Sequence, residues 1–368
     1  MKNILIITNH SYMFWQFRRE LVSALIAQGH RVTLALPLGE RSEDLKALGC
    51  QLIDTPINRR GTSPKQELAL IRLYRQILSE VKPDIVVTYS IKPNLYGGLL
   101  CGSRKIPCCI NVQGLGTAFQ VPVMRNFAAM FYRAATRKAR VVFFENQENA
   151  RLFRERRITP GERQCILSGA GINLEHYALT PYPENDKVHF LFMGRVMREK
   201  GIGELFEAVR RLHAEGEDFH LDIVGFYEDG YAEQVKELTD MGICTFHGFQ
   251  TETRPYYAAA DCVVLPSYHE GMSNVLLEAS AIGRPIITSD IPGCREAVDQ
   301  GINGYTCPPQ NAQALYETMK RILGLSRQQR MEMGLAGNAK MKAEFDKNAV
   351  IEQTIAAIFR EASHEAVH

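Results

Sequence analysis

DCVVLPSYHEGMSNVLLEASAIG, residues 261–283, runs from a short apolar stretch through a small polar turn into an apolar segment that ends at a glycine. The first part has the apolar, β-branched character of a buried strand, and Gly283 is a typical helix stop. The stretch therefore predicts a strand that leads through residues 268–274 into a helix. It also places Glu270 before the helix and Glu278 inside it.

The same alternation of strand-like and helix-length segments extends along the 368 residues. Apolar runs such as NILIIT, DIVVTY and RVVFF alternate with amphipathic stretches such as FRRELVSALIAQG, and after the Pro-rich TPYPENDK the alternation restarts with VHFLFMG. This order implies parallel strands joined by right-handed helical crossovers. We therefore expect an α/β protein with two doubly wound Rossmann-like domains, 1–183 and 184–345, facing each other across a cleft, and a final helix, about 346–368, that returns to the first domain.

The composition is typical of soluble proteins, with 45% hydrophobic and 23% charged residues and a mean hydropathy of -0.17. No apolar run reaches the roughly 20 residues of a membrane span, and the N-terminal MKNILIITNH has the features of a strand rather than a signal peptide. We therefore expect a cytoplasmic protein. The nine cysteines form no C-x-x-C pair, so we expect reduced thiols and no zinc site.

The net charge of +2 hides two halves of opposite sign. Residues 1–180 hold 25 Lys and Arg against 13 Asp and Glu, which gives +12, and residues 181–368 hold 18 against 28, which gives -10. A cationic half indicates an anionic partner, which is a phosphorylated ligand, nucleic acid or an anionic membrane surface. The alternative is that the two halves attract each other.

The segment VPVMRNFAAMFYRAATRKAR, residues 121–140, combines basic, aromatic and methionine side chains and has no acidic residue. Such a helix can lay its apolar side chains among lipid headgroups while its cations meet anionic lipid. The alternative is a core helix with a solvated basic face. We expect no nucleic-acid partner, because no RNA-binding or helix-turn-helix signature is present. The cations expected to contact the membrane are Arg125, Arg133, Arg137, Lys138 and Arg140.

The turn before the predicted helix has the residues of an anion site. Gly271 allows close backbone approach, and Ser273 or Asn274 can cap the helix, whose free amides then face the anion. Glu270 and Glu278 can accept hydrogen bonds from hydroxyls beside that anion, as in a nucleotide-sugar. The alternative is two solvated glutamates, but Glu278 lies among apolar residues, where an unpaired carboxylate is costly.

A second segment, FLFMGRVMREKGIGELFEAV, brings two cations to the end of another strand. The strand ends at Gly194, and Arg195 and Lys200 precede the next helix. Arg195 can bind a diphosphate with forked hydrogen bonds and Lys200 as a point charge, and both can stabilise charge on a departing diphosphate. The alternative is two solvated loop cations.

Together, GRVMREKG and PSYHEGMSNVLLEASAIGRPIITSDIPGCREAV, followed by NGY, resemble the family 4 glycosyltransferases of GT-B fold, and Glu270 and Glu278 match the E-x7-E signature of that family. The resemblance implies that Arg195 and Lys200 hold the donor diphosphate, that Glu278 binds the ribose and that Glu270 contacts the donor sugar. It assigns catalysis to Glu270, Arg195 and Lys200. The other implied donor contacts are Gly271, Met272, Ser273 and Asn274 at the sugar and phosphate, and Gly248, Phe249 and Gln250 at the nucleobase.

The first domain departs from the family in two places. NHSYMFWQFRRE replaces a Gly-Gly turn, which leaves Asn9 and His10 as expected phosphate neighbours. Gln113, in NVQGLGTAF, stands where many relatives have a histidine, so no general base is assigned. YSIKPN and GLGTAF look most like the branch that extends oligosaccharides of capsule, O-antigen or protein glycosylation on polyprenyl diphosphate.

The resemblance implies a bacterial enzyme that retains anomeric configuration and needs no metal cofactor. We expect it to transfer an N-acetylhexosamine, GalNAc or GlcNAc, from a UDP-sugar to a saccharide on polyprenyl diphosphate. The expected location is peripheral, on the inner face of the cytoplasmic membrane. We expect the domain of residues 1–183 to bind the acceptor and to associate with the membrane, and the domain of residues 184–345 to bind the nucleotide-sugar. Two alternatives are a nucleotide-sugar epimerase of GT-B fold and a non-catalytic sugar-nucleotide-binding protein.

Overall fold

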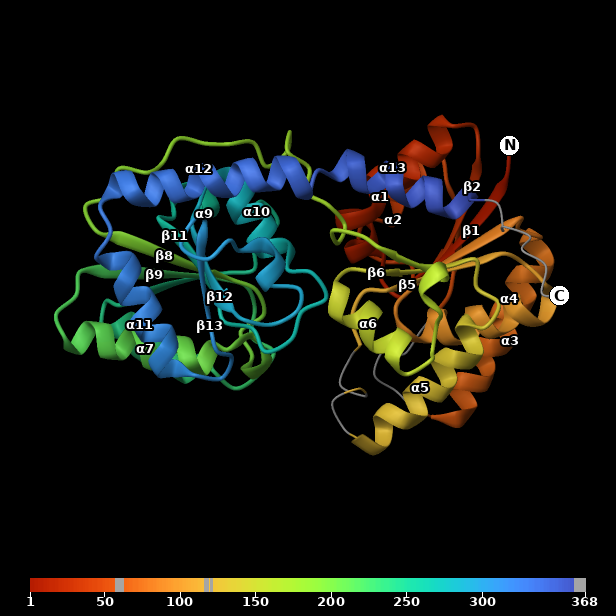
Figure 1. Cartoon of the computed structure of the whole chain (residues 1–368), viewed down its shortest axis with the longest axis horizontal. Helices are drawn as coiled ribbons and strands as arrows, with labels where there is room; N and C mark the ends of the chain where they lie inside the picture. Colours follow the sequence, from red (N-terminus) through yellow and green to blue (C-terminus); the bar gives the residue numbers. More distant parts are fainter. Residues whose placement is uncertain (57–62, 116–118, 120–121, 361–368) are drawn as a thin grey trace. The chain divides into compact units, whose positions relative to one another are not determined.

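The computed structural model describes residues 1–56, 63–115, 119 and 122–360, and the chain divides into two compact units (Figure 1). The first comprises the described residues of Met1–Ala170 and Val350–His368, and the second is Gly171–Ala349. The domain boundary expected at 183/184 differs from this division, because residues 171–183 fold with the second unit. The Tyr182 hydroxyl donates to the Asp261 carbonyl at 2.6 Å, inside that unit.

Within the described residues, the first unit holds a seven-stranded parallel sheet of order β3-β2-β1-β4-β5-β6-β7. The five central strands are the predicted apolar runs. β3 and β7 were not predicted, because both are short, lie at the sheet edges and have half-exposed side chains. The strands are β1 (Asn3–Ile7), β2 (Arg31–Leu36), β3 (Gln51–Asp54), β4 (Ile85–Tyr89), β5 (Cys108–Val112), β6 (Val141–Phe144) and β7 (Gln164–Ile166).

Helices cover both faces of this sheet. One face packs against α1 (Ser11–Ala27), α2 (Ser42–Ala47) and α13 (Lys347–Phe359). The other face packs against α3 (Pro64–Val81), α4 (Gly98–Arg104), α5 (Pro122–Thr136) and α6 (Gln147–Glu155). The final helix joins the first unit as expected, since Val350 and Ile358 of α13 are buried in its core.

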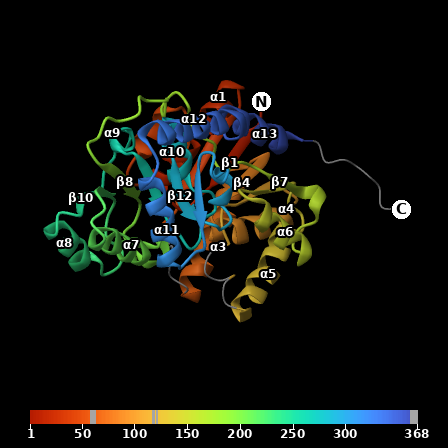
Figure 2. The same ribbon diagram turned by 60° about the vertical axis from the view of Figure 1, so that its left-hand side comes forward.

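In the part of the chain that the structure describes, the second unit holds a six-stranded parallel sheet of order β10-β9-β8-β11-β12-β13. Its helices α7 and α11 lie side by side in both views (Figures 1 and 2). The strands are β8 (Val188–Met193), β9 (Phe219–Val224), β10 (Cys244–Gly248), β11 (Cys262–Leu265), β12 (Ile286–Ser289) and β13 (Gly304–Cys307). The helices are α7 (Ile202–Ala214), α8 (Ala232–Asp240), α9 (Arg254–Ala259), α10 (Asn274–Ile282), α11 (Ala312–Leu323) and α12 (Arg327–Glu344).

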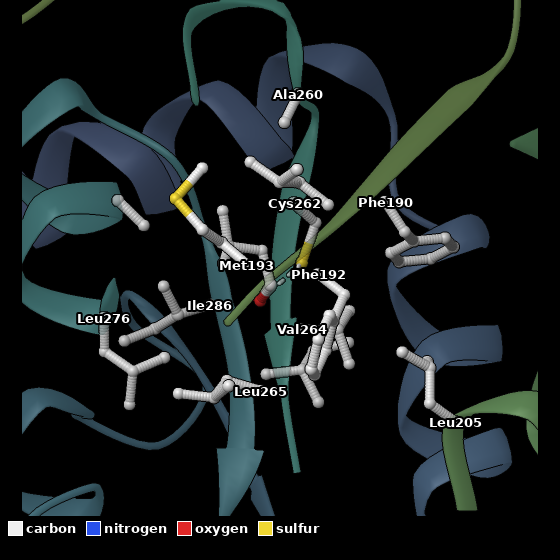
Figure 3. Close-up of a cluster of buried hydrophobic side chains, with 14 of the residues drawn as sticks. Phe190, Phe192, Met193, Leu205, Ala260, Cys262, Val264, Leu265, Leu276 and Ile286 are labelled. Carbon is white, nitrogen blue, oxygen red and sulfur yellow. Dashed lines mark hydrogen bonds between the residues drawn. The ribbon is translucent and has the colours of Figure 1, made fainter. Parts of the chain in front are cut away.

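The core of the second unit lies on both faces of β8 and β11. On one face, Phe192 of β8 packs with Leu205 of α7. On the other face, Met193 of β8 packs with Leu276 of α10 (Figure 3). Burying one such side chain contributes about 1.5–3 kcal/mol to folding. The predicted helix stop is confirmed, because Gly283 follows α10 with a φ of 91°, a conformation that favours glycine.

The strand order reverses between β8 and β11, the two central strands of this sheet. Crossovers from these strands leave in opposite directions, which opens a crevice outside their carboxyl ends where α/β proteins bind ligands. The structure confirms two doubly wound Rossmann-like units. In the second unit, the loops after β8 and β11 therefore lie where a ligand is expected.

Candidate functional site

The loops after β8 and β11 pack directly against each other. Gly201 has a φ of 69°, and a Cβ on it would lie 2.0 Å from the Pro266 carbonyl oxygen. The Tyr268 amide donates to the Glu199 carbonyl at 2.9 Å, which joins the same loops. Glycine at position 201 thus allows the cationic loop to approach the glutamate loop.

Two predicted site residues meet across this contact. Lys200 Nζ lies 2.5 Å from Glu270 Oε1, with side chains 18% and 13% exposed. Ser267 Oγ donates to the same carboxylate oxygen at 2.9 Å. Glu270 therefore balances the charge of Lys200, and an incoming diphosphate would compete with this carboxylate for the ammonium group.

Arg195 also lies at the carboxyl edge of the sheet, and its partner was not predicted. Arg195 Nη1 donates to Glu228 Oε2 at 2.6 Å, and the arginine side chain is 42% exposed. Glu228 follows β9, the neighbour of β8, so both residues belong to loops at the same edge. The sequence signal that could have indicated Glu228 is the segment GFYEDG. In it, Glu228 comes three residues after Gly225, the glycine that follows β9.

The turn that begins α10 is packed closely through its backbone. Ser273 occupies the N-cap position, but its side chain makes no capping bond, and its amide donates to the Gly293 carbonyl at 2.8 Å. A Cβ on Gly293 would lie 2.4 Å from the Gly271 carbonyl oxygen. Met272 is buried in the core, so only its backbone is available at the turn. The amides of Leu276 and Leu277 donate to the Ser273 carbonyl, whereas the helix supplies no acceptor for the amides of Asn274 and Val275.

Glu278 is buried, and the alternative of a solvated helix face is wrong. The residue is 6% exposed, and the Tyr257 hydroxyl donates to its Oε2 at 2.8 Å. Burial raises the pKa of Glu278 to about 7, although hydrogen bonds from Tyr257 and Tyr177 and the charge of Lys347 act in the opposite direction. Sequence reasoning missed both tyrosines, because each lies outside the signature motif.

The predicted nucleobase segment follows β10. Phe249 is 53% exposed, and its ring meets that of Phe226 edge-on with centroids 6.1 Å apart. Gln250 Nε2 donates to the His247 carbonyl at 2.7 Å, which orders the loop after Gly248. Both rings lie in loops after β9 and β10 and are 45% and 53% exposed, so the face of one ring can stack on a planar base.

The site residues predicted in the first domain lie at the end of its own sheet. Asn9 Oδ1 accepts a hydrogen bond from Ser90 Oγ at 2.8 Å. His10 caps α1, with Nδ1 accepting from the Met13 amide at 3.5 Å. Their proximity to a phosphate stays a prediction.

Two glycosyltransferase family models match neighbouring parts of the chain. Residues 15–169 match "Glycosyl transferase 4-like domain" and residues 187–324 match "Glycosyl transferases group 1", which together span most of the chain. The chain belongs to the family 4 glycosyltransferases. This glycosyltransferase is 25% identical, over 92% of its length and 93% of the relative, to the N,N'-diacetylbacillosaminyl-diphospho-undecaprenol alpha-1,3-N-acetylgalactosaminyltransferase of Campylobacter jejuni. It is 30% identical to the amylovoran biosynthesis glycosyltransferase AmsK of Erwinia amylovora, over about half of each chain, 50% and 49%.

Solved structures share the fold of this glycosyltransferase along almost its whole length. A glycosyltransferase from Rickettsia africae matches with a TM-score of 0.79 and 18% identity, over 98% of this chain and all of the other. Anabaena HepE in complex with UDP matches with a TM-score of 0.78 and 18% identity, over 97% and 99%. The GT-B fold is therefore confirmed.

The basic segment of the glycosyltransferase forms α5, and Val121 of that segment lies outside the described residues. One side of α5 packs into the first unit through Ala129, Tyr132 and Ala135. The opposite side exposes Met124, Phe127, Met130 and Phe131, by 46–60%.

The predicted membrane cations differ in their surroundings. Arg133, Arg137 and Lys138 are exposed near the end of α5. Arg125 is only half-buried, whereas Arg140 follows the helix and donates to the Ile358 carbonyl at 3.1 Å. Arg133 and Lys138 also donate to backbone carbonyls, but both side chains stay exposed near the end of α5. Arg140 is half-buried, lies further beyond the helix and bonds to α13, so we leave it out of the proposed membrane contacts.

Neither a metal-binding cluster nor a membrane-spanning helix is found in the residues that the structure describes. Among them, no group of three or more His, Cys, Asp or Glu side chains is arranged to hold a metal ion. Over the same ranges, every helix is too short or too polar to span a bilayer. All nine cysteines are free, and all but Cys165 are buried.

Proposed function

We propose that this glycosyltransferase transfers an N-acetylhexosamine, GalNAc or GlcNAc, from a UDP-sugar to a saccharide on polyprenyl diphosphate, with retention of anomeric configuration. The product belongs to the assembly of a bacterial surface polysaccharide or a glycoprotein glycan. The relative from Campylobacter jejuni, whose name describes such a transfer on a lipid diphosphate, supports this choice of donor and acceptor.

The contact that carries the proposal is the Lys200–Glu270 pair of 2.5 Å beside the start of α10. Lys200 and the free amides of α10 bind the diphosphate of the donor, with Arg195 as a second cation. Once the phosphate takes the ammonium group, Glu270 can accept hydrogen bonds from hydroxyls of the donor sugar. Glu278 binds the ribose hydroxyls, and the exposed face of the Phe226 or Phe249 ring stacks on the uracil ring.

Transfer occurs on one face of the donor sugar. The acceptor hydroxyl oxygen forms the new bond to the anomeric carbon on the face from which UDP departs. The bond from that carbon to the phosphate oxygen breaks, and the hydroxyl proton passes to the departing diphosphate. Lys200 and Arg195 stabilise the negative charge that develops on this diphosphate, and Glu270 positions the sugar.

Two cations at the diphosphate also perform the neutralisation that a divalent metal provides in other enzymes. We therefore propose that transfer proceeds without a metal cofactor. The exposed apolar side of α5, with Arg125, Arg133, Arg137 and Lys138, supports a peripheral position on the anionic inner face of the cytoplasmic membrane.

The test is a screen of UDP-sugars against polyprenyl-diphosphate-linked saccharides, with and without a chelator. We expect product with a UDP-N-acetylhexosamine, release of UDP and unchanged rates after chelation. Activity that disappears with the chelator contradicts the metal-free step. A sugar isomer formed from the donor alone identifies an epimerase, and binding of UDP without any turnover identifies a regulatory protein.

A further inference from the structure

The edge strand β10 contains a β-bulge directly before the predicted nucleobase segment, residues 248–250. β10 is the outermost strand of its sheet, and its pairing with β9 shifts after Phe246, so that Gly248 rather than His247 pairs with Val224. His247 is therefore the extra residue of the bulge. A bulge bends its strand and changes the direction in which the following residues leave the sheet. The position of the nucleobase segment therefore depends on how His247 is held.

A hydrogen bond to the neighbouring strand holds the His247 ring. His247 Nε2 lies 2.7 Å from Asp222 Oδ1 on β9, and the other oxygen of this carboxylate lies 3.0 Å from His189 Nδ1 on β8. Asp222 thus connects side chains of three adjacent strands. The Tyr256 ring of α9 meets the His247 ring edge-on, with centroids 4.9 Å apart. The imidazole is therefore fixed from two sides.

The bond between Asp222 and His247 is a strong one, because Asp222 is ionised. Burial acts to raise the pKa of Asp222, but hydrogen bonds from His189 and His247 outweigh burial and lower the pKa below its usual value. An ionised carboxylate has acceptors only, so both ring nitrogens that face it carry a proton. Hydrogen bonds to a charged acceptor are stronger than those between neutral groups.

The backbone of the bulge is bonded to the nucleobase segment itself. Gln250 Nε2 donates to the His247 carbonyl at 2.7 Å, and the Gly225 amide donates to the Gly248 carbonyl at 2.9 Å. Phe249, whose ring is proposed to stack on uracil, lies between these two bonded positions. The orientation of the Phe249 ring therefore follows from the geometry of the bulge.

We propose that Asp222 and His247 are positioning residues for the nucleobase. Their hydrogen bond keeps the bulge in one geometry, which presents the Phe249 ring to the base. Without this bond the edge strand can relax toward the regular register, in which the following side chains exchange faces. Both residues act through the nucleobase segment. This inference rests on the proposed function and adds the residues that prepare the contact with the base.

The test compares UDP with pyrophosphate, which has a diphosphate but no nucleoside. His247→Phe keeps a ring against Tyr256 and removes the hydrogen bond, whereas Asp222→Leu removes the acceptor at similar volume. We expect both variants to raise the Kd for UDP about tenfold, the size of one base-stacking contact, and to leave the Kd for pyrophosphate unchanged. Calorimetry measures the binding of UDP, and displacement of UDP measures the binding of pyrophosphate.

Thr245→Val is the matched control. Thr245 is exposed on the same strand before the bulge, and its Oγ1 lies 2.9 Å from His220 Nε2 on β9, so this variant also removes a cross-strand hydrogen bond. It should keep the wild-type Kd for both ligands. The inference is overturned if His247→Phe and Asp222→Leu bind UDP as the wild type does, if UDP and pyrophosphate weaken by the same factor, or if Thr245→Val weakens UDP equally.

The wild type separates a failure of this inference from a failure of the proposed function. Absence of UDP binding to the wild type, or failure of pyrophosphate to displace UDP from it, contradicts the proposed donor site. Normal binding of both ligands to the wild type, together with unchanged UDP binding in the two variants, contradicts only this inference. Circular dichroism identifies a variant that does not fold, and the other variant then decides.

Discussion

The hydroxyl of Tyr257 donates to the carboxylate of Glu278 at 2.8 Å, with Tyr257 fully buried and Glu278 6% exposed. This hydrogen bond orients the carboxylate of Glu278, the residue proposed to bind the ribose, before the donor binds. Burial raises the pKa of this carboxyl group to about 7, so the proposed role of Glu278 at the ribose couples nucleotide binding to its protonation. Five predictions follow from this and the other contacts described above.

Binding of UDP should weaken as the pH falls below 7. The charged form of Glu278 accepts the ribose hydroxyls, and protonation of the free site removes that acceptor, so the Kd for UDP rises by up to about tenfold per pH unit. Calorimetric titrations from pH 8 to pH 5.5 measure the effect. Glu278→Gln is the reference, because it retains the titration of UDP itself. An identical pH slope in the two proteins contradicts the prediction.

Removal of the Tyr257 hydroxyl should affect both stability and binding. Tyr257→Phe leaves the buried carboxylate with one donor fewer, which costs about 1–3 kcal/mol in the free energy of unfolding. The lost hydrogen bond favoured the charged form of Glu278, so the midpoint of the pH profile for UDP binding moves upward. Urea denaturation and calorimetry measure these changes. Tyr256→Phe, the neighbouring residue on α9, serves as the control and should match the wild type.

Loss of the Lys200 charge should reduce turnover. Lys200→Met removes a cation that stabilises the departing diphosphate, and we expect kcat/KM to fall by about a hundredfold or more. Lys236→Met, on the exposed side of α8, should leave the rate unchanged. Steady-state rates of UDP release measure both variants. If Lys200→Met keeps wild-type kcat/KM, the diphosphate site lies elsewhere.

The close approach of the two site loops depends on Gly201. In Gly201→Ala the new Cβ meets the Pro266 carbonyl oxygen, in addition to backbone strain at a φ of 69°. Gly216→Ala carries comparable strain, at a φ of 79°, with open space around the Cβ. Gly216→Ala should therefore lose only about 1–2 kcal/mol of stability, and Gly201→Ala should lose more and bind UDP less tightly. Equal denaturation midpoints for the two variants would show that the contact is unimportant.

The exposed apolar side of α5 should bind anionic vesicles. Flotation with vesicles that contain phosphatidylglycerol at low salt should recover the wild type in the lipid fraction. Phe127→Glu combined with Phe131→Glu should abolish recovery, because both rings are exposed and each would be replaced by a charge. Arg140→Gln should float as the wild type does, since Arg140 contacts α13. Equal recovery of the double variant argues against α5 as the contact.

Strands with strong apolar patterns were predicted correctly, whereas short edge strands were missed. β8 and β11 are continuous apolar runs because both faces of a doubly wound sheet are buried. β3 and β7 carry half-exposed side chains and have no such pattern. The boundary at 183/184 was misplaced because Pro181 and Pro183 suggest a linker, whereas the Tyr182 contact to Asp261 is visible only in three dimensions.

The E-x7-E spacing and the two cations predicted one site for Glu270, Glu278, Arg195 and Lys200. The structure brings Lys200 and Glu270 into contact, and the donor contacts of all four residues stay a prediction. The direct Lys200–Glu270 pair, the Glu228 partner of Arg195 and the tyrosines around Glu278 were not predicted. Each of these partners comes from a loop or helix distant in sequence. Local patterns contain no information about which distant groups neutralise a given charge.

The sequence alone determined the parallel α/β architecture, the helix stop at Gly283 and the family, because apolar periodicity and local motifs act over a few neighbouring residues. Tertiary structure decided the charge partners of Lys200 and Arg195 and the burial of Glu278. These depend on which strand ends meet at an edge and on how far each side chain is removed from water, and only the packed sheet sets both.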